Sequence, residues 1–301
     1  MKLVISASPH ISSGATTRKI MGDVLIALCP ALIASIVIFG WRALLVTAVC
    51  AAACVFFEWG FERLCHKEST IGDLSAVVTG VILAYNLPVS IPLWQAVFGA
   101  LVAMVAVKGL FGGLGKNFAN PAIVARIVLF LAFSSSMTAW VYPDAVSSAT
   151  PLAMLAKGEH VDYLTLLLGH HGGCIGETCA LALLLGFAYL LIRRVVTWQT
   201  PVCFVGTVFL LSLILGQDAL AQVLSGGLFL GAIFMATDYS TSPCTAWGKV
   251  LFGIGAGLLT VLIRFYGAYA EGVSFAILFM NILTPYLTRW TRTKPLGGAK
   301  A

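Results

Sequence analysis

The stretch that decides the fold is residues 74–99, which read LSAVVTGVILAYNLPVSIPLWQAVFG. An apolar run ends at Asn86-Leu87-Pro88, and a second apolar run begins after Pro92. Proline lacks an N–H donor and disfavours helix at the residue before it. The first run, expected as a helix over 74–87, is therefore short for a membrane span of about 20 residues. Such broken spans are tolerated where the freed backbone groups face protein or a polar cavity.

Composition assigns the chain to the integral membrane proteins. Hydrophobic residues make up 59% of the 301 residues, charged residues only 10%, and the mean hydropathy is +0.97. These values are typical of an all-α membrane protein. The strand-sized alternation of a transmembrane barrel is absent. Although the net charge is +6, the charges lie between apolar runs rather than in one patch, so no nucleic-acid partner is expected.

Apolar runs predict about ten transmembrane helices within a single membrane domain, residues 1–301. The expected spans are 21–40, 43–61, 74–87, 93–111, 121–140, 177–193, 199–216, 222–236, 247–265 and 274–288. Helix-spaced leucines from Leu152 to Leu168 also predict a short helix at the membrane surface, or a docking face for a partner subunit.

Lysine and arginine orient the spans, because cytoplasmic connections collect them. With the N-terminus inside, Arg42, Lys157 and Arg264 are outer and Arg126 lies within a span, which leaves 14 of the 18 basic residues on the inner side. Both termini are therefore expected in the cytoplasm, with the loop 141–176 in the periplasm or exterior.

An internal repeat runs through the chain. Residues of 74–99 recur about 150–155 positions later, where Leu74-Ser75, Gly80, Pro92, Trp94 and Gly99 match Leu224-Ser225, Gly231, Pro243, Trp247 and Gly253. The halves are approximately 1–150 and 151–301. Since each half holds five spans, an odd number, the two halves must be inverted repeats, as in many transporters.

The outer loop 141–176 is long enough to suggest a function of its own. It contains Ser147 and Ser148, followed by Ala149-Thr150-Pro151. The Thr150 hydroxyl is set among small residues, where a modifying enzyme and a bulky phosphate-bearing group have access. Cys174 and Cys179 lie in or near this loop and either pair in a disulfide or remain free thiols.

Two further polar segments lie near membrane depth. One contains Asn120-Pro121 after a glycine-rich stretch, and the other contains Thr237-Asp238. Asp238 either needs a partner in the membrane or caps a helix in a cytoplasmic loop. Arg126, within an apolar span, either binds an anion such as a flavin phosphate or Asp238, or extends to the cytoplasmic interface.

These motifs together resemble those of a known family. The glycine–asparagine–proline stretch at 108–122, the turn from Asn86 to Gln95, Ala236-Thr237-Asp238 with Ser242-Pro243, and Ser147 to Thr150 occur in this order. They resemble the D subunit of the Rnf ion-translocating electron-transport complex, which is similar to the B subunit of the sodium-pumping NADH:quinone oxidoreductase.

The resemblance implies a urea-transporter-like fold of ten helices in two inverted repeats. It also implies FMN joined by a phosphoester to Thr150, beside Ser147 and Ser148, and a second, unattached riboflavin on the cytoplasmic side. Asn120, Arg126, Thr237 and Asp238 are the other residues expected near flavin. Ser13-Gly14-Ala15-Thr16 matches the family's Ser-Gly-Ala-Thr attachment motif more literally, but the charge pattern puts it in the cytoplasm.

The implied function is that of a subunit of a translocase-type oxidoreductase. Such a subunit passes electrons through FMN, and its complex couples them to Na⁺ or H⁺ movement across the inner membrane. The implied partners are a flavin transferase, a periplasmic flavin subunit, other membrane subunits and lipid. The alternative is a cofactor-free solute channel or transporter of the same fold. The sequence holds no iron–sulfur pattern and no nicotinamide site, so the chain alone carries no complete active site.

Overall fold

The structure is a computed structural model, and it describes residues 15–67, 69–140, 150–158, 161–267 and 272–292. The regular elements in these ranges are all helical. In chain order they are α1 (Thr17–Phe39), α2 (Trp41–Leu64), η1 (Ile71–Asp73), α3 (Ser75–Tyr85), α4 (Leu93–Leu101), η2 (Val102–Gly109), α5 (Pro121–Ala132), α6 (Ser134–Met137), α7 (Pro151–Ala156), α8 (Tyr163–Leu168), α9 (Ala180–Ile192), α10 (Gln199–Ile214), α11 (Ala219–Leu224), α12 (Leu228–Leu230), η3 (Gly231–Met235), α13 (Ala246–Tyr266) and α14 (Val273–Trp290).

Among the described residues, three helices have the length and apolar composition for a membrane crossing: α1, α2 and α13. The apolar segments α3, α4 with η2, α5, α9 and α10 are shorter, at 10–17 residues. At a rise of about 1.5 Å per residue, all of them are shorter than the roughly 30 Å of hydrocarbon. Neighbouring protein must therefore cover their ends.

The break expected at Asn86-Leu87-Pro88 is confirmed. Helix α3 ends at Tyr85, and the side-chain amide of Asn86 donates to the carbonyl of Ile82 at 2.6 Å. The chain resumes as a helix only after Pro92, which is the N-cap of α4. Helix α3 therefore ends inside the bundle, where Asn86 is fully buried.

Three expected elements differ from the structure. The span over 222–236 is broken after α11 because Gly226 adopts a φ of +67°, which stops the helix before α12. The span over 121–140 ends at Ala132, and the short helix α6 follows. In place of one surface helix from Leu152 to Leu168 there are two, because Gly158 at a φ of +77° ends the first.

The elements form two series with the same order. In the first, α1 and α2 precede a short helix, a long interrupted helix and α5. In the second, α9 and α10 precede the broken segment from α11 to η3, followed by α13 and α14. The first members of the two series, α1 and α9, contact each other, as do the last members, α5 and α14.

Matching hydrogen bonds close each series. In the first, the Ser90 hydroxyl before α4 donates to the carbonyl of Ala139 after α6 at 2.7 Å. In the second, the hydroxyl of Thr245 before α13 is hydrogen-bonded to that of Thr291 after α14. Ser90 and Thr245 are 155 positions apart, within the spacing of the sequence repeat.

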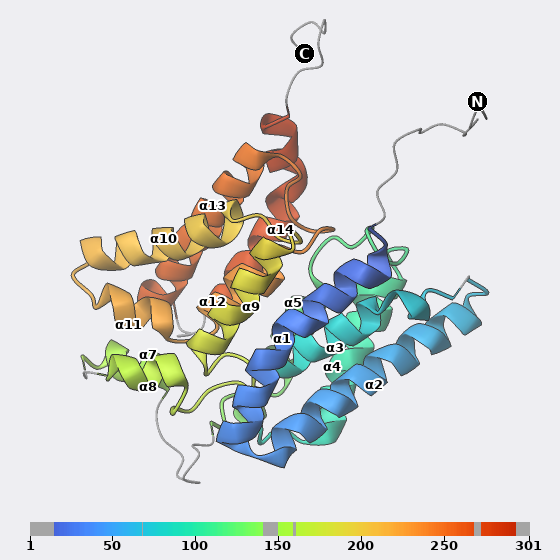
Figure 1. Cartoon of the computed structure of the whole chain (residues 1–301), viewed down its shortest axis with the longest axis horizontal. Helices are drawn as coiled ribbons and strands as arrows, with labels where there is room; N and C mark the ends of the chain where they lie inside the picture. Colours follow the sequence, from blue (N-terminus) through green and yellow to red (C-terminus); the bar gives the residue numbers. More distant parts are fainter. Residues whose placement is uncertain (1–14, 68, 141–149, 159–160, 268–271, 293–301) are drawn as a thin grey trace, which may run out of the picture.

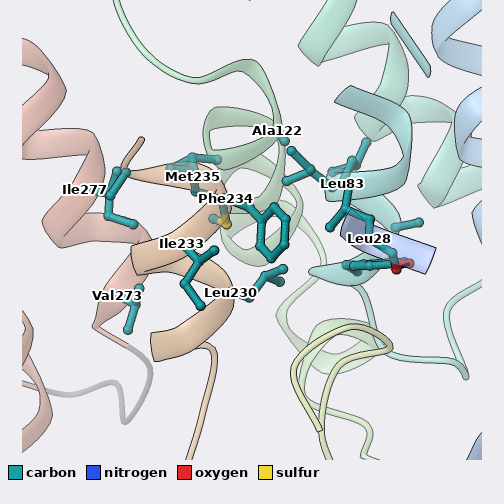
Figure 2. Packing of buried hydrophobic residues seen from close by; sticks show 14 of the residues in the cluster. Leu28, Leu83, Ala122, Leu230, Ile233, Phe234, Met235, Val273 and Ile277 are labelled. Atoms are coloured by element: carbon teal, nitrogen blue, oxygen red, sulfur yellow. Dashed lines mark hydrogen bonds between the residues drawn. The ribbon is translucent and has the colours of Figure 1, made fainter. Parts of the chain in front are cut away.

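The core lies where the two series meet. Figure 2 shows Ile233, Phe234 and Met235 of η3 between Leu83 and Ala122 on one side and Val273 and Ile277 on the other. Figure 1 shows α1 beginning at the upper side, where α14 ends, and finishing at the lower edge, the side on which α7 and α8 lie. The broken segment η3 is therefore enclosed by protein, as the backbone of an interrupted helix requires.

Candidate functional site

Thr150, the residue expected to carry flavin, is the N-cap of α7 and is half-buried. Its Oγ1 accepts a hydrogen bond from the backbone N–H of Ala153 at 3.3 Å. Pro151 occupies the first helical position, where a missing N–H has little cost. Leu152 and Leu155 are buried, and α7 packs against α11. This packing fixes the position of the Thr150 hydroxyl at one edge of the molecule.

A basic group lies near Leu152, two residues after Thr150. The guanidinium of Arg264 donates to the carbonyl of Gln222 at 2.6 Å and to that of Ser225 at 3.2 Å. A side chain at Gly226 would meet both Leu152 and Arg264, which therefore lie close together. Ser147 and Ser148 lie outside the described residues.

A second tie holds this edge together. The Tyr163 hydroxyl of α8 donates to the carboxylate of Asp218, the N-cap of α11, at 2.7 Å. That hydrogen bond raises the pKa of the Tyr163 phenol. Helices α7, α8 and α11 therefore form one platform at the edge of the bundle, with Thr150 at the start of its first helix.

Arg126 lies in the middle of the molecule and is 6% exposed. Its Nη1 donates to Oδ1 of Asn86 at 2.8 Å, and its Nη2 donates to Sγ of Cys174 at 3.8 Å. Asp238 is instead bonded by Ser240 and Thr241. Of the alternatives considered for Arg126, the pairing with Asp238 is therefore wrong, and Arg126 joins the end of α3 to a loop before α9.

That loop, residues 169–179, enters the bundle. The N–H groups of Ile175 and Gly176 donate to the carbonyls of Leu87 and Tyr85, each at 3.0 Å. Glu177, 4% exposed, accepts from the N–H of Cys174 at 2.9 Å through Oε1. The loop therefore supplies hydrogen bonds to the backbone that the break after α3 exposes.

Cys174 and Cys179 in this region are not joined by a disulfide. Cys174 is fully buried beside Arg126, whereas the Cys179 thiol donates to the carbonyl of Leu167 at 3.7 Å. The structure therefore contains no Cys174–Cys179 disulfide, and Cys174 is shielded from solvent.

A pocket opens between the two series near the start of α1. Asn120, Thr237 and Asp238 all line it, together with Ser75 and Lys108. Its cavity volume is about 80 Å³, below the roughly 300–1,000 Å³ of small-molecule sites, so a larger ligand must displace some of the lining side chains. We call it the central pocket.

The sequence motifs explain how the polar groups of the central pocket are held. Asn120 is the N-cap of α5, its Oδ1 accepting from Ala122 N–H at 3.0 Å, while its Nδ2 donates to Met235 at 3.5 Å. The Thr237 hydroxyl donates to the carbonyl of Ile233, four residues earlier, at 2.5 Å. This hydrogen bond holds Thr237 against the end of η3. Oriented to satisfy its neighbours, the Asn281 amide donates to Thr241 and accepts from Asn120, both at 3.2 Å.

The candidate residues thus fall into three groups. Asn120, Thr237 and Asp238 share the central pocket, Arg126 lies with Asn86 and Cys174, and Thr150 lies on the platform. The central pocket is near the start of α1, whereas the platform is at the opposite edge (Figure 1). One bound group cannot touch all of them.

Sequence reasoning missed five buried charged residues, one of which, Asp23, is 8% exposed and lies on α1. Glu58, Glu62 and Lys108 are 3–8% exposed and lie together, and Glu177 is near Arg126, since a side chain at Gly227 would meet both. The signal for the first two was visible in the sequence: Glu58 and Glu62 are four residues apart and therefore lie on one face of an apolar helix. Glu177 had no such signal, because the residues around its side chain are distant in the sequence and come together only in the folded chain.

Comparison with known proteins identifies relatives over the whole chain. The chain is 44% identical to the D subunit of a Na⁺-translocating ferredoxin:NAD⁺ oxidoreductase complex from Acetobacterium woodii, covering 100% of this chain and 97% of that protein. The D subunit of a proton-translocating ferredoxin:NAD⁺ oxidoreductase complex from Clostridium ljungdahlii is 38% identical, covering 97% and 96%. The D subunit of an ion-translocating oxidoreductase complex from Escherichia coli is 32% identical, covering 98% and 99%.

These relatives confirm the resemblance drawn from the motifs. Residues 4–297 match a single family model. The matched range includes both broken helices, the platform and the central pocket. The chain therefore belongs to the NQR2, RnfD, RnfE family.

Proposed function

We propose that this chain is the D subunit of an Rnf-type complex, a ferredoxin:NAD⁺ oxidoreductase that moves ions across a membrane. The support is the membership in this family over residues 4–297 and the names of relatives that are 32–44% identical. The chain works as a subunit of that oxidoreductase, and electrons reach it from partner subunits.

The fold we propose is a single membrane domain of about ten helices in two inverted repeats, 1–150 and 151–301, of the urea-transporter type. Equivalent polar contacts support it. Lys108 donates to the Ser75 hydroxyl at 2.6 Å at the start of α3, and Arg264 contacts Ser225 before α12. Lys108 lines the central pocket, whereas Arg264 contacts α11 of the platform, so the two contacts lie toward opposite ends of the helices, as inversion requires. Ser75 and Ser225 are matched in the sequence repeat.

We propose the inner membrane as the location, with both termini cytoplasmic and the loop 141–176 periplasmic. The charge distribution supports this orientation. The start of α1 and the end of α14 share one edge, while α7 and α8 occupy the other (Figure 1). The platform is then available to a periplasmic flavin subunit, and other faces contact lipid and further membrane subunits.

The cofactor we propose is FMN, joined by a phosphoester to Thr150 by a flavin transferase. When bound, FMN supplies one- and two-electron transfer. The single observation that carries this proposal is the position of the Thr150 hydroxyl as an N-cap at the accessible edge of the platform. Esterification replaces the hydroxyl hydrogen but leaves the oxygen able to accept from Ala153. The positive charge of Arg264 lies on the same side and favours a phosphate there.

We further propose that the central pocket holds the second, unattached riboflavin. Its wall includes apolar groups from α3 and η3 and the polar side chains of Asn120, Thr237 and Asp238. Apolar walls with a few fixed polar groups are typical of cofactor sites. Arg126 and Asn86 line neither of the two proposed flavin sites, and their hydrogen bond holds the end of the broken helix α3.

In-gel flavin fluorescence after denaturation tests the covalent site. Wild-type protein from cells that contain the flavin transferase should fluoresce, and Thr150→Ala should lose the signal completely. Thr16→Ala is the matched control, since Thr16 ends the literal Ser-Gly-Ala-Thr motif and caps α1. This control should keep full fluorescence. Unattached flavin, released to the supernatant, should be equal in all three proteins.

Two outcomes would contradict the proposal. Fluorescence that survives in Thr150→Ala but not in Thr16→Ala would move the attachment to the cytoplasmic motif. A wild type with neither covalent nor released flavin would favour the cofactor-free transporter of the same fold.

A further inference from the structure

A second pocket, with a cavity volume of about 360 Å³, lies between α9 and α10. Apart from Gly206, every residue that lines it has an apolar side chain. One wall comes from Leu184 and Phe187 of α9, the other from Val202 and Phe209 of α10, and the floor from Val223 of α11 and Ile233 of η3. We call it the lateral pocket.

The lateral pocket runs from the outside of the molecule to its core. Val202 and Phe209 are 49% and 38% exposed, whereas Val223 and Ile233 are 6% and 1% exposed. Helix α9 packs chiefly on α1 and helix α10 on α13, so the two helices diverge from the loop that joins them (Figure 1). Water does not fill an apolar space, and an empty one deprives its lining of packing contacts. The lateral pocket therefore suits an apolar occupant that enters from the membrane.

The loop 193–198 between α9 and α10 lies at the edge of the molecule where α1 begins. The guanidinium of Arg193 is bonded to Asp23, near the start of α1, at 3.2 Å. This bond holds the end of α9 against α1. With the orientation proposed above, this edge is at the cytoplasmic surface of the membrane.

Two side chains of the loop are placed to bind a phosphate beside the lateral pocket. Arg194 follows Phe187 by two helical turns and is exposed just past the end of α9. In the part of the chain that the structure describes, its guanidinium has no hydrogen bond or ion pair. Trp198, 57% exposed, is the N-cap of α10 and precedes Val202 by one turn on the same face. An indole is favoured at the membrane–water interface, and a guanidinium binds phosphate strongly.

We propose that the lateral pocket binds an acyl chain of an anionic phospholipid whose phosphate is held by Arg194 beside Trp198. Basic sites between helices on the cytoplasmic side of a membrane bind anionic headgroups. A phospholipid matches both parts of the site, because it is apolar along the pocket and negatively charged at the mouth. An apolar helix of a partner subunit would fill the pocket but leave Arg194 without an anion. The assignment to the cytoplasmic leaflet rests on the proposed orientation.

Ile233 connects the lateral pocket to the central pocket, because its side chain lines both. Its carbonyl accepts the hydrogen bond from Thr237, one of the polar groups of the central pocket. An acyl chain packed against Ile233 supports η3 from the membrane side. The bound lipid therefore stabilises the wall of the central pocket.

Photocrosslinking of the purified complex tests this site. The probe is phosphatidylglycerol with a diazirine in one acyl chain, diluted in phosphatidylcholine nanodiscs, and it should label peptides of α9 and α10. Arg194→Gln should lower the labelling about fivefold, the effect of removing one basic group at a membrane surface. Gly206→Phe should abolish it by filling the pocket, since nothing lies within 4 Å of a Cβ at Gly206.

Two matched controls should be labelled like the wild type. Arg289→Gln removes another exposed arginine, near the end of α14 at the same edge of the molecule. Gly60→Phe makes the same substitution at a glycine of α2 whose Cβ also meets nothing within 4 Å.

A diazirine-bearing phosphatidylcholine separates the headgroup from the chain. It should label the wild type less than phosphatidylglycerol does, and Arg194→Gln should not change its labelling. Equal labelling by both lipids, unaffected by Arg194→Gln, would overturn the headgroup site. If neither lipid labels α9 and α10, and p-benzoylphenylalanine in place of Gly206 crosslinks to another polypeptide, a partner helix fills the pocket and the proposal fails. Covalent flavin is measured on the same samples, so a failure of the proposed function is seen separately.

Discussion

Arg126 illustrates what a single residue reveals before and after folding. An arginine in an apolar span predicts a partner, and the structure supplies Asn86 and Cys174, which lie 40 and 48 positions away. No local pattern marks either residue as the partner, because the contact exists only once α5, the end of α3 and the loop 169–179 are assembled. The sequence therefore predicts the need for a partner but not its identity.

The Arg126 side chain has a structural task that the sequence does not indicate. Arg126→Ala removes charge-assisted hydrogen bonds worth about 1.5–3 kcal/mol each and leaves Glu177 without its nearby positive charge. We expect a clearly lower unfolding temperature and less assembled complex. Arg193→Ala is the control, since the Arg193 side chain is 43% exposed and its partner Asp23 keeps the hydrogen bond from the Tyr189 hydroxyl at 3.0 Å; its effect on unfolding should therefore be smaller.

Thermal unfolding and the rate of flavin reduction, measured on the same preparations, separate the two roles of Arg126. Normal stability with slow flavin reduction would restore the expectation drawn from sequence, in which Arg126 acts on flavin. A low unfolding temperature rescued in part by Arg126→Lys would support the structural role.

At the scale of elements, broken helices decide the architecture. The break at Asn86-Leu87-Pro88 is predictable because proline acts through local sterics. The break at Ser225-Gly226-Gly227 is not, since glycine permits a left-handed φ without requiring it. The burial of the loop 169–179 is even harder to predict from the sequence. Its burial depends on the end of α3, which only the three-dimensional arrangement supplies.

Gly176 tests how closely that loop and α3 are packed. A Cβ at this position would lie 2.2 Å from Cγ of Tyr85, whose ring is fully buried. Gly176→Ala must therefore displace the loop or the ring, which costs about 1–3 kcal/mol or more. Gly206→Ala in α10 is the control: nothing lies within 4 Å of its Cβ, and alanine favours helix by up to about 1 kcal/mol.

Thermal unfolding of both glycine variants measures this difference. Gly176→Ala should unfold at a lower temperature than wild type, and Gly206→Ala at the same or a higher one. Equal stability of the two variants would mean that the loop does not pack closely on Tyr85.

For the whole molecule, composition predicts the helical membrane class, and the distribution of charge predicts the orientation. The helical class follows from hydropathy alone, and the predicted repeat follows from residues matched about 150–155 positions apart. The distribution of the candidate residues over three places could not be predicted, because Asn120 and Arg126 are six positions apart yet face different surroundings. Asn120 and Arg126 point in different directions from α5, and this places them in different sites.

The orientation of the molecule is the prediction on which the FMN proposal depends, because Thr150 must lie outside the cytoplasm. Lys157 is exposed at the end of α7, one turn beyond the platform contacts, whereas Cys65 is exposed at the end of α2 on the opposite side. In right-side-out vesicles, an impermeant maleimide should label Lys157→Cys within the intact membrane. It should label the native Cys65 only after permeabilisation.

The wild type is the matched control, because it has the same native cysteines and lacks the cysteine introduced at position 157. The variant Cys65→Ser identifies which signal comes from the inner side. Labelling of Cys65 in intact vesicles, with Lys157→Cys protected until permeabilisation, would reverse the molecule and place Thr16 rather than Thr150 on the flavin-attaching side.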